Sequence, residues 1–134
     1  MIKIGDTFEQ TFQYTQADVE IFAEVSNDKN PIHLDEEYAA QTSFGKRIIH
    51  GMLSASIFSK VLAMDFPGEG TIYLHQSLDF KRAMFVDQEY LVKLTVLEIV
   101  ERRHTAEIQT QVFSQENGKI MLDGKARIMN KEKI

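Results

Sequence analysis

A loop with the sequence Asn-Asp-Lys-Asn-Pro-Ile-His carries the clearest chemical signal in the chain. It places the carboxylate of Asp28 and the imidazole of His33 five residues apart. Pro31 disfavours helical backbone at Asn30, so we expect a stiff, non-helical loop on which the two side chains converge. A carboxylate beside an imidazole suits general acid–base chemistry. The alternative is that Asp28 only accepts hydrogen bonds from loop amides and that His33 merely precedes a helix cap at Asp35.

A second candidate is the backbone of Gly51, which begins a long apolar stretch. An N–H group in the first turn of a helix has no intrahelical partner and lies at the positive end of the helix dipole. Glycine has no Cβ to obstruct an approaching ligand, so this N–H suits an oxyanion that develops on a carbonyl. The alternative is that Gly51 is small because the helix start packs tightly against a sheet.

The other three histidines give weaker signals. His50 caps a loop carbonyl or lines a cleft, and we expect a structural role. His75 and His104 alternate with apolar residues and are interpreted as strand positions. No two histidines have a spacing typical of metal ligands, so we predict no metal site.

Gln76 and four basic residues also require an interpretation. Gln76 shares its parity with the apolar residues of a predicted strand, so its amide needs partners in a buried network or at the rim of a cleft. Lys46, Arg47, Lys81 and Arg82 are able to attract phosphate groups. Dispersed surface charges need no special reason, however, and we favour a solvated surface for these four.

Composition excludes several classes of protein. The chain has 134 residues and no cysteine, which excludes disulfides, a cysteine nucleophile and a thiolate metal site. Its 15 basic and 20 acidic residues give a net charge of −5, so we expect no nucleic-acid partner. The apolar run at 52–64 is interrupted by serines and a lysine and is too short to cross a membrane. The acidic first ten residues are unlike a signal peptide. We therefore predict a single cytoplasmic domain over residues 1–134.

Helical signals lie in the first half of the chain and strand signals in the second. Thr15 and Asp18 form a capping pattern for a helix that ends near Ser26, and acidic residues from Asp35 start a short second helix. The longest predicted helix, 50–64, is apolar around most of its circumference and is therefore buried. Alternating residues predict strands at 7–14, 72–81, 90–100, 104–113 and 119–129, with an Asn-Gly turn before the last.

These elements predict an α+β architecture, in which a curved antiparallel sheet wraps around the 50–64 helix. A sheet with one apolar face needs a cover, and this helix is the only long apolar element available. We expect the last four strands to follow one another as a meander. Exposed edge strands invite pairing with a second copy, so we predict a homodimer.

Three blocks of the sequence resemble the MaoC-like, or type 2, enoyl-CoA hydratases. The first block runs from Phe22 through the Asp28–His33 loop to Ala39. The second and third blocks are Phe44-Gly45 with Ile49-His50-Gly51-Met52, and Gln76-Ser77-Leu78-Asp79-Phe80 followed by Phe85-Val86-Asp87. The resemblance implies the hot-dog fold, a catalytic dyad of Asp28 and His33, and a Gly51 amide that binds the thioester oxygen. The chain departs from the family pattern at Asn27, Ala83 and Val86, and asparagine at 27 is tolerable because it enters left-handed backbone conformations.

The resemblance further implies reversible hydration of a trans-2-enoyl-CoA, with an acyl-CoA substrate and no cofactor. The central helix offers four residues beyond Gly51 that can line an apolar pocket for the acyl chain: Ala55, Phe58, Ser59 and Leu62. Three alternatives stay open. They are a hot-dog acyl-CoA thioesterase, a 3-hydroxyacyl-carrier-protein dehydratase, and an acyl-CoA-binding module without enzymatic activity.

Overall fold

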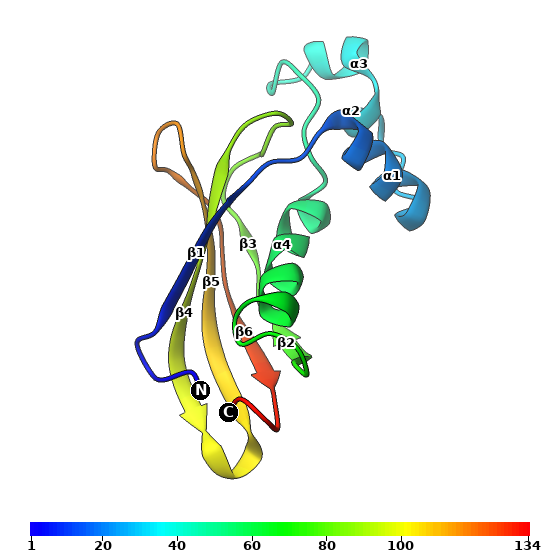
Figure 1. The fold of residues 1–134 in the computed structure, drawn as a ribbon. Helices are drawn as coiled ribbons and strands as arrows, with labels where there is room; N and C mark the ends of the chain where they lie inside the picture. The colour runs from blue at the N-terminus through cyan, green and yellow to red at the C-terminus, as the bar shows by residue number, and fades with distance from the viewer.

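The computed structural model describes residues 1–134 and contains one antiparallel sheet, a long helix along its face and three shorter helices (Figure 1). The strands are β1 (Thr7–Phe12), β2 (Ile72–Gln76), β3 (Asp79–Phe80), β4 (Tyr90–Val100), β5 (Thr105–Ser114) and β6 (Ile120–Met129). The helices are α1 (Gln16–Ser26), α2 (Pro31–Leu34), α3 (Glu36–Ala40) and α4 (Gly51–Met64). A single 3₁₀ turn, Glu101–Arg103, joins β4 to β5.

The sheet has the strand order β1-β4-β5-β6-β2, and β3 also pairs with β6. The prediction of consecutive strands is confirmed for β4, β5 and β6, and Gly118 with φ 71° lies in the turn before β6. The predicted four-strand meander is wrong, because β2 pairs with β6 and not with β4. Both sides of β4 are already occupied, by β1 and β5, so β2 joins the free edge of β6.

The predicted strand at 72–81 is divided into β2 and β3 by a break at Ser77. The Ser77 N–H donates to the carbonyl of Lys125 at 2.9 Å, and the strands on both sides of the break pair with β6. A Cβ on Gly124 would lie 1.9 Å from the Ser77 carbonyl oxygen, which leaves room only for glycine. His104 is also not a strand residue. It adopts a left-handed conformation with φ 55° in the turn before β5.

Helix α4 lies along the concave face of the sheet, as predicted (Figure 1). Seven of its fourteen residues are buried, among them Phe58, Val61 and Leu62. They belong to one apolar cluster with alternate residues of the long strands, such as Leu94 and Ile108. Burial of each large side chain contributes roughly 1.5–3 kcal/mol, so α4 is fixed firmly relative to the sheet.

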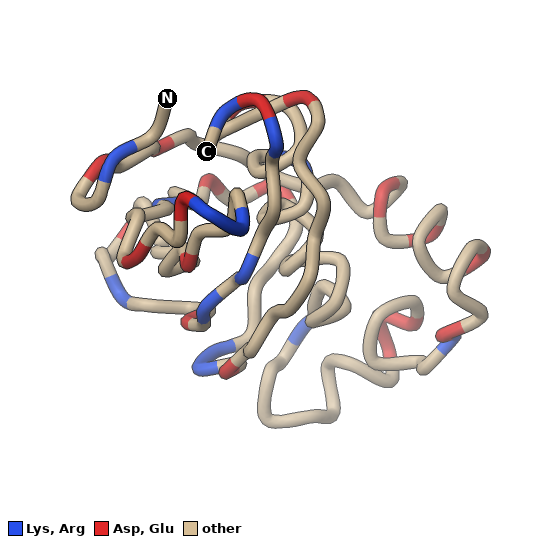
Figure 2. Tube along the Cα trace, turned by 90° about the horizontal axis from the view of Figure 1, so that it is seen from below, with Lys and Arg blue, Asp and Glu red and all other residues tan.

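Helices α1, α2 and α3 form a separate group beyond one end of the sheet (Figure 1). The predicted capping box is confirmed: Thr15 and Asp18 exchange side-chain and backbone hydrogen bonds at the start of α1. Asp35 caps α3 by accepting from the Tyr38 N–H. The charged Asp and Glu residues of α1 and α3 are not mixed with Lys or Arg, whereas charges of both signs mix over the strands (Figure 2). None of the helices has the length and apolar character needed to cross a bilayer.

Candidate active site

Asp28 lies just after α1, on a turn stabilised by local hydrogen bonds. Asn27 ends the helix with a left-handed φ of 62°, a conformation that asparagine tolerates. The Ser26 hydroxyl donates to the Phe22 carbonyl at 2.7 Å and accepts the Asp28 N–H at 3.1 Å. The Oδ1 atom of Asp28 accepts the N–H of Asn30 at 3.3 Å. The carboxylate therefore has a backbone partner, as the structural alternative expected, while its position remains exposed at the end of a rigid turn.

His33 lies on α2, a single helical turn, so the expectation of non-helical backbone at this residue is wrong. Pro31 occupies the first position of the turn, where a missing N–H does no harm, and the Asn30 side chain caps it by accepting the Ile32 N–H at 3.2 Å. Only 8% of His33 is exposed. The Gln16 side chain donates to the His33 carbonyl at 2.9 Å and ties α2 to α1.

One hydrogen bond fixes the tautomer of His33. Its Nδ1 lies 2.8 Å from the carbonyl oxygen of Ile48, and only a protonated nitrogen can donate to a carbonyl. The neutral ring therefore carries its lone pair on Nε2. Burial lowers the pKa of His33, repulsion from His50 lowers it further, and the Ile48 carbonyl and Asp28 partly oppose this. At neutral pH the Nε2 atom is a proton acceptor.

His50 completes the cluster, a result that sequence spacing did not reveal. Its ring stacks on the His33 ring, with centroids 3.9 Å apart and planes 28° apart. Its Nε2 donates to the backbone carbonyl of Asp28 at 2.9 Å, so the expectation that His50 binds a loop carbonyl agrees with the structure. A carboxylate oxygen of Asp28 and one ring nitrogen of each histidine lie within 4.8 Å of one another.

The stacked rings are poorly arranged for a metal ion. The lone pair of an imidazole nitrogen lies in the ring plane, and an ion binds along it at about 2.0–2.1 Å. The two rings are almost parallel at 3.9 Å, so an ion close to both nitrogens would lie outside at least one ring plane. The cluster is better suited to hold water, because one water can bridge two polar groups whose separation is too large for direct bonding.

Helix α4 starts beside this cluster with unpaired backbone donors. Its N-cap residue, His50, makes no side-chain capping bond, and the N–H groups of Gly51, Met52 and Leu53 have no acceptor in the protein. Gly51 also fits tightly, because a Cβ would lie 2.7 Å from the Phe80 ring. Both interpretations of Gly51 are therefore compatible with the structure: a free donor and a close packing contact.

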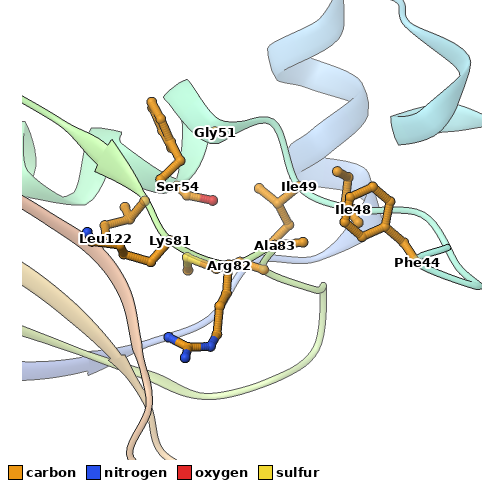
Figure 3. Close-up of a pocket in the computed structure, with 11 residues that line it drawn as sticks. Phe44, Ile48, Ile49, Gly51, Ser54, Lys81, Arg82, Ala83 and Leu122 are labelled. Carbon is orange, nitrogen blue, oxygen red and sulfur yellow. The ribbon is translucent and has the colours of Figure 1, made fainter.

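Gly51 lines a cavity of about 390 Å³ between α4 and the segment after β3 (Figure 3). Ser54 on α4, Ile49 and Leu122 are among its other lining residues. The Arg82 guanidinium turns away from α4 (Figure 3) and donates to the Ile120 carbonyl. This cavity gives a ligand access to the first turn of α4.

The four predicted acyl-pocket residues lie on two sides of α4. Ala55 and Ser59 line a groove of about 450 Å³ between α4 and β2, whereas Phe58 and Leu62 lie in the core and are at most 1% exposed. At the same groove lies Gln76, which was expected to need polar partners.

The Gln76 amide has three partners. Its Nε2 donates to the Thr110 hydroxyl and to the Ser77 carbonyl, each at 2.8 Å, and its Oε1 accepts from the Tyr73 hydroxyl. Burial raises the pKa of Tyr73 to about 12, so the tyrosine remains a donor at any physiological pH. The predicted inward orientation of Gln76 is thus confirmed, and its amide forms a partly buried network at the groove.

Three of the four basic residues considered for phosphate binding have other partners. Arg47 forms an ion pair with Glu36 at 2.9 Å, Lys46 lies 4.4 Å from the centre of the Phe85 ring, and Arg82 binds a backbone carbonyl. These contacts agree with the preferred interpretation of an ordinary solvated surface.

Comparisons with known proteins identify the family of the chain. A family model described as "MaoC like domain" matches residues 2–117. The chain is 39% identical over 125 residues to an (R)-specific enoyl-CoA hydratase of Aeromonas caviae, covering 93% of this chain and 92% of the relative. It is 33% identical to a mitochondrial 3-hydroxyacyl-carrier-protein dehydratase of Arabidopsis thaliana, covering 94% and 76%.

A solved structure shows the same architecture. The unliganded R-hydratase of Pseudomonas aeruginosa superposes with a TM-score of 0.91 at 43% identity, covering 98% of this chain and 83% of that one. The fold is therefore the hot-dog fold that the resemblance implied. The chain belongs to the MaoC-like family and is a hydro-lyase, an enzyme of the hydratase and dehydratase class.

Proposed function

We propose that the protein catalyses the reversible addition of water to a trans-2-enoyl-CoA, giving the (R)-3-hydroxyacyl-CoA. The observation that carries the proposal is the position of the Asp28 carboxylate within 4.8 Å of a His33 ring nitrogen, beside the uncapped start of α4. One water is able to bridge two polar groups at this separation. The name of the A. caviae relative supports both the carrier and the stereochemistry.

His33 acts as the base in the proposed reaction. The substrate is a conjugated thioester, so its C3 atom is electrophilic. The Nε2 lone pair of His33 accepts a proton from the water while the water oxygen bonds to C3, and the Asp28 carboxylate orients the second O–H of the water. A positioned acid–base group typically contributes about 10²–10⁴-fold to the rate.

The Gly51 N–H stabilises the charge that forms during the addition. Electron density moves from the C2–C3 double bond to the thioester oxygen, and this unpaired donor is available to bind that oxygen. The proton taken from water is then delivered to C2 on the same face, so the dyad returns to its initial state. The water and the thioester supply every atom of the product, and the reaction needs no cofactor.

The groove between α4 and β2 is our candidate for the acyl chain. Ala55 and Ser59 line it directly, whereas Phe58 and Leu62 lie in the core and do not line it. Enlargement of Ser59 is expected to shorten the longest chain that is accepted. An unchanged chain-length profile in this variant would contradict the assignment of this groove.

A second candidate is dehydration of a 3-hydroxyacyl group on an acyl-carrier protein. The similarity to the A. thaliana dehydratase favours it, and the same dyad would carry out the chemistry. Rates with coenzyme A and with carrier-linked substrates, compared at equal concentration, distinguish the two carriers. Release of free thiol without loss of the double bond would instead indicate a thioesterase.

The test of the proposed function is the loss of enoyl absorbance from crotonyl-CoA. We expect Asp28→Asn and His33→Ala each to lower kcat by at least about 10²-fold. Asp35→Asn is a matched control, because Asp35 also accepts one backbone N–H but at the start of α3. His104→Ala controls for loss of an imidazole that binds a backbone carbonyl elsewhere. Equal rates in the dyad variants and the controls would refute the proposed dyad.

We also propose that the protein is a homodimer that pairs along β2. This strand is at the edge of the sheet, and Ile72 and Leu74 are 52% and 46% exposed. An apolar edge strand of this kind is a template for pairing with another chain. Light scattering should give the mass of a dimer for the wild type and a smaller mass for Leu74→Lys. A monomeric wild-type protein would contradict the proposal.

A cytoplasmic location belongs to the same proposal. The chain is acidic and contains no cysteine, so it has no need of an oxidising compartment. Cell fractionation with an antibody to the chain tests this location.

A further inference from the structure

His50 contacts all three parts of the proposed active site, although the proposed mechanism gives it no chemical step. Its Nε2–H group binds the backbone of Asp28, its ring covers His33, and its own backbone is the N-cap of the helix that begins at Gly51. It is only 2% exposed. These contacts join three segments that are separated along the sequence.

The bond to Asp28 fixes the turn that carries the carboxylate. His50 Nε2 donates to the Asp28 carbonyl at 2.9 Å, across 22 residues of sequence. The other bonds of this turn are local, between Ser26, Asp28 and Asn30. They define the shape of the turn but not its position relative to α4. The bond from His50 is the one that connects the turn to the start of that helix.

The stacking contact restricts the ring of His33. The His50 ring lies 3.9 Å from it and is itself packed against Phe22, with centroids 4.8 Å apart. The Ile48 carbonyl holds the Nδ1 edge of His33. With one face covered and one edge bound, the His33 ring is oriented so that Nε2 remains available.

His50 is not arranged as a residue that serves stability alone. Its Nδ1 atom is buried without a hydrogen-bond partner, and a buried unpaired acceptor is destabilising. It also fails to cap α4, so the first N–H groups of the helix remain free. A residue selected only for packing would avoid both features.

We propose that His50 is a positioning residue for the reaction proposed above. It holds the Asp28 turn and the His33 ring in fixed positions relative to the free N–H of Gly51. The inference rests on the proposed function. Displacement of reacting groups by about 1 Å is able to lower a rate about 10²-fold, so loss of this relative positioning has a measurable effect on kcat.

Two substitutions separate the contacts of His50. His50→Phe keeps an aromatic ring against His33 but loses the donor to Asp28. His50→Gln places an amide nitrogen near the position of Nε2 and loses the ring. His104→Phe is the control, because His104 also binds a backbone carbonyl at 2.8 Å but lies in the turn before β5.

We expect His50→Phe to lower kcat about 10²-fold while KM changes less than about threefold. The substitution displaces the reacting groups relative to one another and leaves the substrate contacts unchanged. His50→Gln should recover kcat to within about tenfold of the wild type by restoring the bond to Asp28. The two titratable groups that act on His33 are Asp28 and His50. Because His50 lowers the pKa of His33, its replacement should shift the acidic limb of the kcat/KM profile to higher pH in the Phe variant, with no shift in His104→Phe.

Several outcomes would overturn the proposal. A folded His50→Phe variant with wild-type kcat would exclude a positioning role, and a Gln variant as slow as the Phe variant would exclude the bond to Asp28 as its basis. If the Phe variant does not fold, the Gln variant and its pH profile carry the test.

A failure of the proposed function is recognised separately, because the wild type would then be inactive with coenzyme A and carrier-linked enoyl substrates. NMR titration of the His33 ring needs no substrate. A shift of its pKa in His50→Phe but not in His104→Phe supports the coupling, and identical titrations would refute it.

Discussion

Replacement of Gly51 by proline is the most direct test of the backbone donor at the start of α4. Gly51 is the first residue of the helix, a position where proline is favoured because its missing N–H breaks no helical bond. The preceding residue, His50, has φ −54° and ψ 133°, an extended conformation that is compatible with a following proline. Since the Gly51 N–H has no acceptor in the protein, the substitution removes a donor without breaking a protein hydrogen bond.

The steric effect of the new side chain must be separated from loss of the donor. A Cβ at position 51 would lie 2.7 Å from the Phe80 ring, and the three nearest atoms all belong to Phe80. Phe80 is half exposed, so Phe80→Ala creates the space at small cost to the core. In that background, Gly51→Ala keeps the N–H and Gly51→Pro deletes it, while both add a Cβ.

We expect kcat for crotonyl-CoA hydration to be about 10²–10³-fold lower in Gly51→Pro/Phe80→Ala than in Gly51→Ala/Phe80→Ala, equivalent to about 2.7–4 kcal/mol. Circular dichroism and thermal unfolding establish that both double variants are folded, and Phe80→Ala alone gives the reference rate. Equal kcat values in the two folded double variants would show that the Gly51 N–H does not bind the developing charge.

Three further predictions concern pH and stability. Because burial lowers the pKa of His33 below its ordinary 6.5, the contribution of the neutral ring to the free energy of unfolding is complete above pH 6.5 and decreases as the pH falls. Urea unfolding between about pH 5 and 8 should show that the free energy of unfolding of the wild type decreases toward acidic pH, and that it decreases less in His33→Asn. The same pH dependence in both proteins would contradict this prediction. Gln76→Leu leaves the buried Thr110 hydroxyl and the Ser77 carbonyl without their donor. Chemical denaturation should show that this variant has a free energy of unfolding lower by about 1–3 kcal/mol. An unchanged denaturation midpoint would show that the hydrogen bonds of Gln76 do not contribute to stability. Gly124→Ala, whose Cβ would lie 1.9 Å from the Ser77 oxygen, should lower the free energy of unfolding by more than about 4 kcal/mol or prevent folding. The control is Gly118→Ala, where only the positive φ is strained, and it should lower the free energy of unfolding by about 1–2 kcal/mol. Similar melting temperatures in the two variants would refute the steric argument.

Local patterns were sufficient to predict most elements of the fold. The capping box at Thr15, the buried helix 50–64 and the alternation in β4, β5 and β6 each depend on neighbouring residues, and each is confirmed. The place of β2 in the sheet depends on which strand edge is free, which no local pattern encodes. The break at Ser77 depends on Gly124, 47 positions later, which leaves room for the Ser77 carbonyl.

The same distinction applies to the candidate site. Asp28 and His33 are neighbours in sequence, so their juxtaposition could be predicted from the loop alone. His50 lies 17 positions after His33, and its stacking on that ring depends on how α4 is docked relative to α1 and α2. The available signal was a histidine directly before a glycine at a helix start, and it indicated a loop-carbonyl partner without identifying which carbonyl. The helical turn at His33 does not follow from the sequence, because a proline indicates a helix end before it and is equally compatible with the first position of a helix.

The distribution of helix caps gives independent support for a ligand at the start of α4. Thr15, Asn30 and Asp35 each cap a helix with a side-chain oxygen, so α1, α2 and α3 each have a side-chain acceptor for one N–H of the first turn. Helix α4 is longer and more deeply buried than these three, yet His50 stands at its N-cap and directs its donor to the Asp28 carbonyl. A capping side chain there would add about 1 kcal/mol of stability by accepting the N–H of Met52 or Leu53, the second or third helical residue. Its oxygen would then lie beside the Gly51 N–H, so the lack of a cap leaves this helix start open to a substrate oxygen.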